Sequence, residues 1–279
     1  MTSDFVQIND WPIWYDKYGT GPQPLLMIPG GIGTGQTDFY EQLEGDDILD
    51  FDQLTIIAVE PPGYGRSRPP NRRYDSNVYD TDAECCYQLM KHLGFDTFHV
   101  IGWSDGARSA ITLVCKYPEA VTKLVVTNIF AFADNKTLSV LKSNQTVDRW
   151  HQDRVKCYLR SYKDTVEIQR MWDRQIRFME HMRTYLPNDP NEEKYKSIKC
   201  PVLVIQGDKD HITSAEHSEY IMKRVSTAEL HRFANGSHDL HQRYSATFKK
   251  VVEDFLLHGI LSQPTRKREY KYIPHKSIK

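Results

Sequence analysis

Short apolar runs, separated by longer polar or amphipathic segments, recur along most of the chain. The runs are five to eight residues long, and many are rich in β-branched or aromatic residues, which is typical of β-strands. We predict strands at DFVQIN (4–9), PIWYDKYG (12–19), PLLMI (24–28), LTIIAVE (54–60), TFHVIGW (97–103), KLVVTNIF (123–130), CPVLVIQG (200–207) and AELHRF (228–233). The first two strands flank a turn at Asn9-Asp10, so we expect them to form an antiparallel hairpin.

Segments with helical character lie between most of these strands. Their apolar residues recur at the spacing of one helix face, and prolines mark some of their ends. We predict helices at 38–49, 80–93, 104–118 and 241–257. Because strands alternate with helices, the sequence predicts an α/β fold with a mostly parallel central sheet, right-handed crossovers and helices on both faces.

The alternation stops between residues 133 and 196, where polar and aromatic helical segments replace the strands. We interpret this stretch as an inserted helical cap, since 279 residues suit one large domain with an insertion better than two independent domains. The predicted organisation is a core of residues 1–132 and 197–261, a cap at 133–196 and a basic, solvated tail at 262–279. Trp150 and Trp172 are expected to pack the cap helices together rather than contact a substrate.

The composition argues against several classes of partner. With 36 basic and 37 acidic residues the formal net charge is -1, so no overall field would gather nucleic acid or an anionic membrane. Five cysteines without CxxC spacing signal neither a disulfide framework nor a zinc site, and the amino terminus lacks the features of a signal or transit peptide. We therefore expect a cytoplasmic protein, monomeric by default, that acts on a small molecule without metal or cofactor.

One motif predicts a nucleophile. Gly102-Trp103-Ser104-Asp105-Gly106 matches GxSxG and lies where a predicted strand meets a predicted helix. A nucleophilic serine at such a junction occupies a strained turn, and the two glycines leave room for neighbouring backbone. Ser104 is therefore the candidate nucleophile. Asp105 is unexpected, because a carboxylate beside an oxyanion site opposes the negative charge that develops there.

A serine nucleophile requires a histidine base and an orienting carboxylate, in the chain order Ser, acid, His. Asp210 follows a predicted strand, and His238 lies on the loop between the last strand and the last helix. Asp208 and Asp239 are the competing acids, and we expect Asp208 to form hydrogen bonds within the turn. The competing histidines, His231 within a strand and His241 on a helix, lack the loop position typical of catalytic groups.

The glycine-rich loop PGGIGTG (29–35) follows the strand at 24–28. It is expected to present backbone N–H groups to an oxyanion, with Gly31 as first donor and the N–H of Asp105 as second. A dinucleotide site is the alternative, because Glu60 ends a strand as the acidic residue of such a site would. The loop lacks the third glycine of GxGxxG, so we expect no nicotinamide cofactor.

Together these motifs resemble the α/β-hydrolase superfamily, and within it the biphenyl-hydrolase-like, or valacyclovir hydrolase, family. The similarity covers residues 1 to about 257 and rests on PGGIGTGQTDF, EPPGYGRSRPP, GWSDGA, CPVLVIQGDKD and GSHDLHQRY. It implies an α/β-hydrolase fold and a triad of Ser104, Asp210 and His238. It also implies an oxyanion hole formed by Gly31 and Asp105, and binding of a substrate α-ammonium by the Asp105 carboxylate.

This chain departs from the family pattern at a few positions. Glu60 stands where the family usually has aspartate, Ala107 and Arg108 follow the GxSxG motif, and the basic tail has no counterpart. These differences bear on specificity rather than on reaction type. Mammalian members are associated with mitochondria, so the resemblance also allows that location.

The leading hypothesis is a serine hydrolase that cleaves α-amino-acid esters, or related activated esters and thiolactones, through an acyl-enzyme. One alternative keeps the triad but acts on plain carboxylic esters, or on a carbon–carbon bond, without amino-group selectivity. Another is a ligand-binding protein that retains the fold without catalysis. Turnover of aminoacyl and non-amino esters separates the first two hypotheses, and acylation of Ser104 separates both from the third.

Overall fold

The computed structural model of the protein describes residues 1–185 and 192–259. Within these residues an eight-stranded sheet has the order β1-β2-β4-β3-β5-β6-β7-β8. The strands are β1 (Thr2–Ile8), β2 (Trp11–Tyr18), β3 (Gln23–Ile28), β4 (Leu54–Val59), β5 (Phe98–Trp103), β6 (Val121–Thr127), β7 (Val202–Gly207) and β8 (Ala228–Phe233). The pairs β1–β2 and β2–β4 are antiparallel, and the other neighbours are parallel. The predicted fold class is therefore confirmed.

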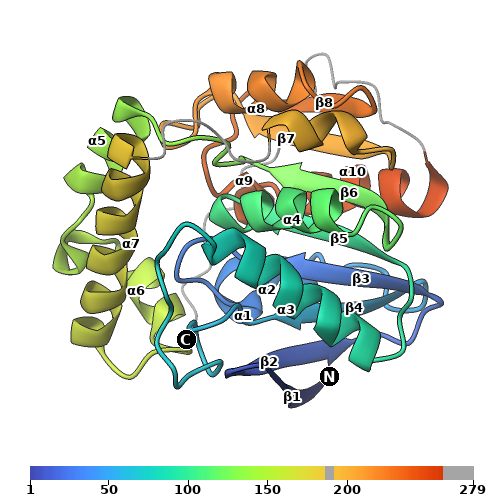
Figure 1. Ribbon diagram of the computed structural model, residues 1–279, viewed down its shortest axis with the longest axis horizontal. Helices are drawn as coiled ribbons and strands as arrows, with labels where there is room; N and C mark the ends of the chain where they lie inside the picture. The colour runs from blue at the N-terminus through green and yellow to red at the C-terminus, as the bar shows by residue number, and fades with distance from the viewer. Residues whose placement is uncertain (186–191, 260–279) are drawn as a thin grey trace.

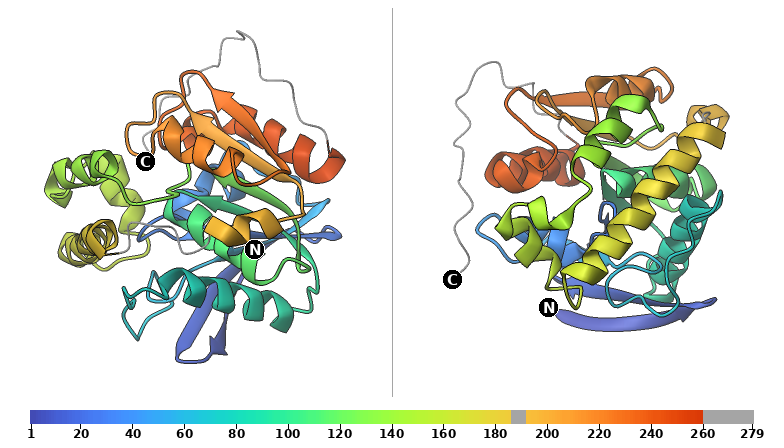
Figure 2. Two further views of the ribbon diagram at one scale, coloured as in Figure 1. Left: turned by 45° about the horizontal axis from the view of Figure 1, so that its top comes forward. Right: turned by 90° about the vertical axis from the view of Figure 1, so that its left-hand side faces the viewer.

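Side chains alternate along the strands, so each face of the sheet buries its own apolar core. Leu26 and Val100 face the first core and pack with α3, α4 and α8. Met27 and Ile101 face the second core and pack with α2, α9 and α10. The bounds are α1 (Gly35–Asp38), α2 (Tyr40–Leu43), α3 (Val78–His92), α4 (Asp105–Lys116), α8 (Ala215–Met222), α9 (Leu240–Arg243) and α10 (Ser245–His258). Figure 2 shows helices on both sides of the sheet.

A group of helices inserted between β6 and β7 forms a separate layer. It comprises α5 (Asn135–Ser143), the 3-10 helix η1 (Val147–Arg149), α6 (Gln152–Tyr158) and α7 (Thr165–Tyr185), and we call it the cap. An apolar cluster joins the cap to the core, and it includes Ile168 and Met171 of the cap and Ile32 and Phe130 of the core. It stands beside one end of the sheet, at the left of Figure 1. The chain then returns to the core through the 3-10 helix η2 (Glu192–Ser197), where Tyr195 is buried.

Three features of the helices differ from the sequence prediction. In the stretch predicted as a helix at 38–49, α1 ends at Asp38 and α2 covers only Tyr40–Leu43, and residues 44–49 form turns and irregular structure. Helix α8 was not predicted, because it is short and contributes few apolar residues to the core. The helix predicted at 241–257 is divided into α9 and α10 at Tyr244, whose backbone has φ −121° and ψ 42°. The Tyr244 hydroxyl donates to the carbonyl oxygen of Asn235 at 3.1 Å, an interaction between segments that local helix propensity does not contain.

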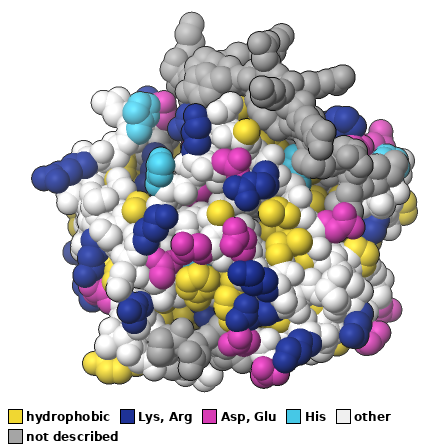
Figure 3. Space-filling model, turned by 90° about the horizontal axis from the view of Figure 1, so that it is seen from above, with side chains coloured by type: hydrophobic (Ala, Val, Ile, Leu, Met, Phe, Trp, Pro, Cys, Tyr) yellow, Lys and Arg dark blue, Asp and Glu magenta, His cyan; other side chains and the backbone are white. Residues whose placement is uncertain are grey.

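The surface carries charges of both signs. On the face shown in Figure 3, lysine and arginine side chains are interspersed with aspartate and glutamate side chains. Within the described residues, no helix combines the length and the apolarity that crossing a membrane demands. The predicted basic tail at 262–279 lies outside the described residues.

Candidate active site

Ser104 occupies a sharp turn between β5 and α4. Its φ of 54° and ψ of −119° lie in a region that non-glycine residues rarely adopt, and such strain is found at functional sites. The flanking glycines are needed for space. A Cβ atom on Gly106 would overlap the carbonyl oxygen of Pro29, and one on Gly102 would lie 2.6 Å from the Cα of Ala107. The GxSxG pattern therefore has a steric cause, which is close packing of the turn against β3 and α4.

The three residues expected to form a triad lie within hydrogen-bond distance of one another. Nε2 of His238 is 2.9 Å from Oγ of Ser104, and Nδ1 is 2.8 Å from Oδ2 of Asp210. Asp210 also accepts hydrogen bonds from the backbone N–H of Ile212 and from the N–H and hydroxyl of Thr213. Burial raises the pKa of Asp210, but His238 and these donors outweigh burial and hold the pKa below its ordinary value.

The competing residues lie elsewhere. Asp208 forms an ion pair with Arg232, with 2.7 Å between Oδ1 and Nε. His231 is buried within β8. His241 is fully buried, with its Nε2 2.7 Å from the carbonyl oxygen of Asp38, and burial lowers its pKa to about 4. Of the candidates considered, His238 and Asp210 are the pair that the structure brings to Ser104.

Two residues that sequence reasoning missed hold the His238 loop. The Nδ2 of Asn128 donates to the carbonyl oxygens of Ser237 and His238, and its Oδ1 accepts from the N–H of Gly207. The indole of Trp103 also donates to the His238 carbonyl, at 2.9 Å. Asn128 has a φ of 44°, a conformation that asparagine tolerates better than most residues, and this is a weak signal that a sequence can carry.

The loop with Gly31 follows β3, and Gly31 and Asp105 line the same pocket as Ser104. Asp105 begins α4, where the first N–H groups of a helix have no acceptor within the helix. Asp38 stabilises the loop, because its Oδ2 accepts a hydrogen bond from the N–H of Gly30 at 2.8 Å. Burial raises the pKa of Asp38 to about 7. These positions are consistent with the expected oxyanion site.

The carboxylate of Asp105 is buried in the pocket and held by two neutral donors. The Tyr79 hydroxyl donates to Oδ1 at 2.6 Å, and Nε2 of Gln175 donates to Oδ2 at 3.2 Å. Burial raises the pKa of Asp105, although the positive charge of Arg72 opposes the rise. Gln175 is fixed in turn, since its Oε1 accepts from the Tyr64 hydroxyl at 2.9 Å. The negative charge at this position is thus built into a hydrogen-bond network.

The pocket around Ser104 has a volume of about 60 Å³ and lies between core and cap. The cap contributes side chains of small, apolar, aromatic and charged types. They are Thr137, Leu141, Arg154, Tyr158, Trp172, Gln175 and Met179. Trp172 therefore lines the pocket as well as packing edge-on against Trp150, so the expectation that it only packs the cap is incomplete.

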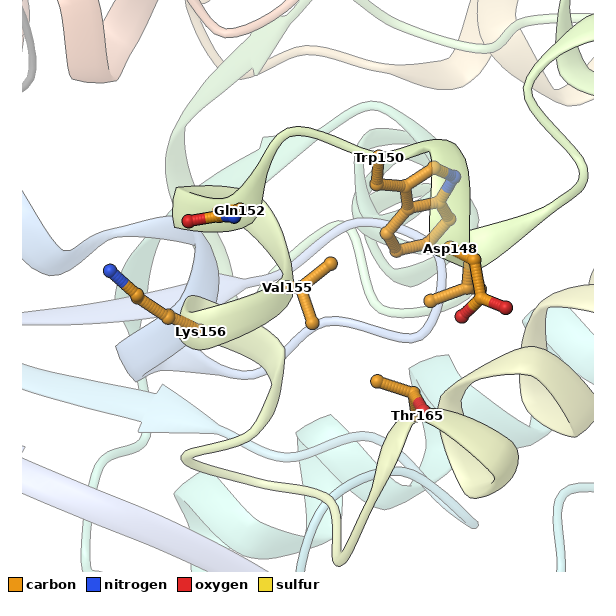
Figure 4. A pocket seen from close by; sticks show the side chains of 7 residues that line it. Asp148, Trp150, Gln152, Val155, Lys156 and Thr165 are labelled. Carbon is orange, nitrogen blue, oxygen red and sulfur yellow. The ribbon is translucent and has the colours of Figure 1, made fainter.

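A second cavity, of about 290 Å³, lies in the cap between η1, α6 and the start of α7. Figure 4 shows Trp150 beside this cavity, with Val155, Asp148 and Thr165 around it. Residues of the Ser104 pocket do not line it. No cluster of three or more potential metal ligands occurs in residues 1–185 and 192–259.

The sequence resembles proteins of known class over most of its length. The profile of a family described as alpha/beta hydrolase fold matches residues 23–155, and that of a family described as TAP-like protein matches residues 148–267. A human protein named serine hydrolase BPHL is 31% identical, over 92% of this chain and 87% of the human protein. The chain belongs to the biphenyl-hydrolase-like family of α/β hydrolases. A mouse protein of the same name is 29% identical, with the same coverage.

Solved structures share the fold at lower identity. A crystal structure of an alpha/beta hydrolase enzyme from a deep-sea metagenome library of the Medee basin has a TM-score of 0.70 and 18% identity, covering 95% of this chain and 100% of that one. Membership of the family, together with the fold, establishes the protein as a hydrolase of the α/β class. Of the site residues expected from the sequence, Gly31, Ser104, Asp105 and His238 line one pocket, and Asp210 contacts it through His238.

Proposed function

We propose that this protein is a serine hydrolase that cleaves esters of α-amino acids, or related activated carbonyl compounds such as thiolactones, through an acyl-enzyme. The observation that carries the proposal is the buried Asp105 carboxylate, which shares one pocket with Ser104 and His238. Burial disfavours the negative charge of this carboxylate, and although Arg72 and Arg108 oppose that effect, a cation bound in the pocket would stabilise the charge further. The α-ammonium of an amino-acid ester is a cation two bonds from the scissile carbonyl carbon.

The reaction follows from the hydrogen bonds of the triad. His238 Nε2 removes the proton of Ser104 as Oγ attacks the ester carbonyl, and Asp210 stabilises the imidazolium through Nδ1. The N–H groups of Gly31 and Asp105 bind the oxyanion of the tetrahedral intermediate. His238 then gives its proton to the leaving alcohol, which departs and leaves an acyl group on Ser104. Water attacks this acyl group with His238 again acting as base, and free Ser104 is regenerated.

Asp105 has opposite effects on the reaction with and without a cation. Two unit charges about 4 Å apart interact by about 4 kcal/mol at an effective dielectric near 20. Repulsion between an unpaired carboxylate and the oxyanion would therefore cancel an appreciable part of the stabilisation that the oxyanion site provides. An α-ammonium pairs with Asp105 and attracts the oxyanion at the same time. Because Tyr79 and Gln175 use two of the acceptor positions of Asp105, others are left for an ammonium group.

Two measurements test this function. Values of kcat/KM are compared for an alanine ester, its N-acetyl derivative and the matching propionate ester, and the free-amino ester is expected to exceed the other two by about tenfold or more. Labelling with a fluorophosphonate, followed by mass spectrometry, is expected to modify Ser104 in the wild-type protein and to be absent from Ser104→Ala. A protein that hydrolyses all three esters at the same rate contradicts the amino-acid ester proposal, and one that is never labelled contradicts the serine hydrolase proposal.

A second candidate is supported by one relative. A Pseudomonas putida protein, 24% identical over 92% of this chain and 97% of its own length, is named 2-hydroxy-6-oxononadienedioate/2-hydroxy-6-oxononatrienedioate hydrolase 2. That name describes an oxo-dicarboxylate substrate rather than an ester. The same triad would then attack a ketone and expel a carbon leaving group. If the protein turns over such a compound faster than the alanine ester, this second candidate is favoured.

A further inference from the structure

Arg154 places a positive charge in the Ser104 pocket. It lies on α6 of the cap and lines the same pocket as Ser104, Asp105 and His238. Its guanidinium carbon is 3.5 Å from the centroid of the Trp150 ring, which corresponds to stacking on the indole face. The Trp172 and Tyr158 rings lie 5.5 Å and 5.8 Å from the same carbon. Three aromatic side chains therefore surround this cation.

No carboxylate contacts the guanidinium of Arg154 directly. In the described part of the chain no carboxylate oxygen lies within 4.0 Å of its guanidinium nitrogens, and its charge interacts with the buried carboxyl of Asp38 without an ion pair between the two. Other arginines near the cap do have acidic partners. Arg68 pairs with Glu167 at 2.7 Å, and Arg72 pairs with Asp82 at 2.7 Å.

The stacked position determines which part of Arg154 is left for a ligand. Stacking on Trp150 uses the flat face of the guanidinium, whereas its N–H donors point outward in the plane of the group. A planar fork of donors in a partly desolvated pocket matches the two oxygens of a carboxylate. The pocket thus offers a negative charge from the core, at Asp105, and a positive charge from the cap, at Arg154.

We propose that Arg154 binds a carboxylate of the substrate, so that the pocket takes esters with an ammonium beside the scissile carbonyl and a carboxylate farther away. This inference rests on the proposed function and narrows its substrate class to amphoteric esters. The carboxylate belongs either to the acyl side chain or to the leaving group, and the two sources are distinguishable by experiment. Stacking against Trp150 positions the guanidinium for that ligand.

Two nearly isosteric substrate pairs test the proposal. The α-esters of glutamate and glutamine differ by a carboxylate in the acyl side chain, and alanyl esters of 4-hydroxybenzoate and 4-hydroxybenzamide differ by one in the leaving group. For at least one pair, the wild-type kcat/KM is expected to favour the charged member by about tenfold or more. Arg154→Gln is expected to bring the ratio of kcat/KM between the charged and the neutral member to about one. Arg154→Lys is expected to retain part of the preference, because it keeps the charge but lacks the planar fork.

A matched control comes from the same region of the cap. Arg160 stacks on Tyr40 with its guanidinium carbon 4.7 Å from the ring centroid, but it does not line the pocket. Arg160→Gln is expected to leave both substrate pairs unchanged. If Arg154→Gln lowers kcat/KM equally for charged and neutral members, or if the wild-type protein prefers neither charged member, Arg154 only stabilises the cap and the proposal is wrong.

A binding measurement separates this proposal from the proposed function. By calorimetry, Ser104→Ala is expected to bind the charged member of at least one product pair about tenfold or more tightly than the neutral member. The pairs are glutamate and glutamine for the acyl side chain, and 4-hydroxybenzoate and 4-hydroxybenzamide for the leaving group. Ser104→Ala with Arg154→Gln is expected to bind both members of each pair equally. If the protein shows this binding preference but hydrolyses no aminoacyl ester, the anion site at Arg154 is supported and the proposed reaction is contradicted. If both proteins bind the charged and the neutral ligands equally, and the wild-type protein hydrolyses charged and neutral esters at the same rate, the proposed reaction is supported and the anion site is contradicted.

Discussion

Replacing Asp38 with asparagine is expected to stabilise the protein at alkaline pH and to have much less effect at acidic pH. Asp38 is 2% exposed, and burial raises its pKa from 3.8 to about 7 although Arg154 and His238 oppose the rise. Folding therefore takes up a proton at this carboxyl. The stability of the wild-type protein falls as the pH rises from the unfolded pKa of 3.8 through the folded pKa of about 7, because above that pH a charge is buried.

The magnitude follows from the same shift. Between about pH 5 and about pH 8 the folded carboxyl releases its proton while the unfolded one is already ionised, so the linkage relation gives a loss of roughly 2 to 3 kcal/mol. Asparagine should preserve the local hydrogen bonds. Its oxygen can accept the N–H of Gly30, and its amide can donate to Oγ1 of Thr37, which itself donates to the carbonyl oxygen of Thr34.

Urea unfolding of the wild-type protein and Asp38→Asn at the two pH values measures this effect. The variant is expected to gain roughly 2 to 3 kcal/mol relative to wild type on going from about pH 5 to about pH 8. Asp52→Asn, which removes an exposed carboxylate, is the control for loss of a charge. If Asp38→Asn differs from wild type by the same free energy at both pH values, the carboxyl does not change its ionisation between them and the argument is refuted.

Three further predictions concern the triad, the serine turn and the attachment of the cap. Asp210→Asn is expected to lower kcat by about 10⁴-fold in steady-state kinetics, whereas Asp208→Asn stays within about twofold, and the reverse order would reassign the acid. Gly106→Ala is expected to lower the free energy of unfolding by about 2 kcal/mol or more in urea titrations, because its Cβ would overlap the carbonyl oxygen of Pro29. A variant as stable as the wild-type protein would contradict this steric argument. Asp134 accepts a hydrogen bond from His217, and although burial raises its pKa, this partner lowers the pKa to about 2. The stabilising contribution of Asp134 is present above the unfolded pKa of 3.8 and is lost as the pH falls toward 2. Between about pH 5 and about pH 2, Asp134→Asn is therefore expected to lose about 1 to 2 kcal/mol less stability than the wild-type protein, as measured by thermal melts.

The strands and the nucleophile are local features, which is why the sequence predicts them. A buried parallel strand is a short apolar run, and the Ser104 turn needs glycine on both sides, so both leave a mark within a few residues. Asp210 could be ranked above Asp208 because the distance past the strand end decides which side chain reaches His238.

Contacts between distant segments leave no comparable mark. Asn128 holds the His238 loop, which is 110 residues away in the chain, and Gln175 reaches Asp105 across 70 residues. Arg154 looks like any other charged residue of an amphipathic helix until the cap is placed over the sheet. The hydrogen bond that links Tyr244 to Asn235, at the break between α9 and α10, is likewise a tertiary interaction. For these residues the sequence shows the side chain but not its neighbours.

The measurement that tests the central claim most directly is the effect of Asp105→Asn on a pair of esters that differ only in the α-amino group. Asparagine keeps the size of the side chain and the backbone N–H of the oxyanion site but removes the charge. If Asp105 binds the substrate ammonium, kcat/KM should fall by about 10- to 100-fold for the alanine ester and by less than about threefold for the propionate ester, with Asp208→Asn changing neither. Equal losses for the two esters would contradict the account, because the carboxylate beside Ser104 would then serve the structure of the turn and not the recognition of an amino-acid ester.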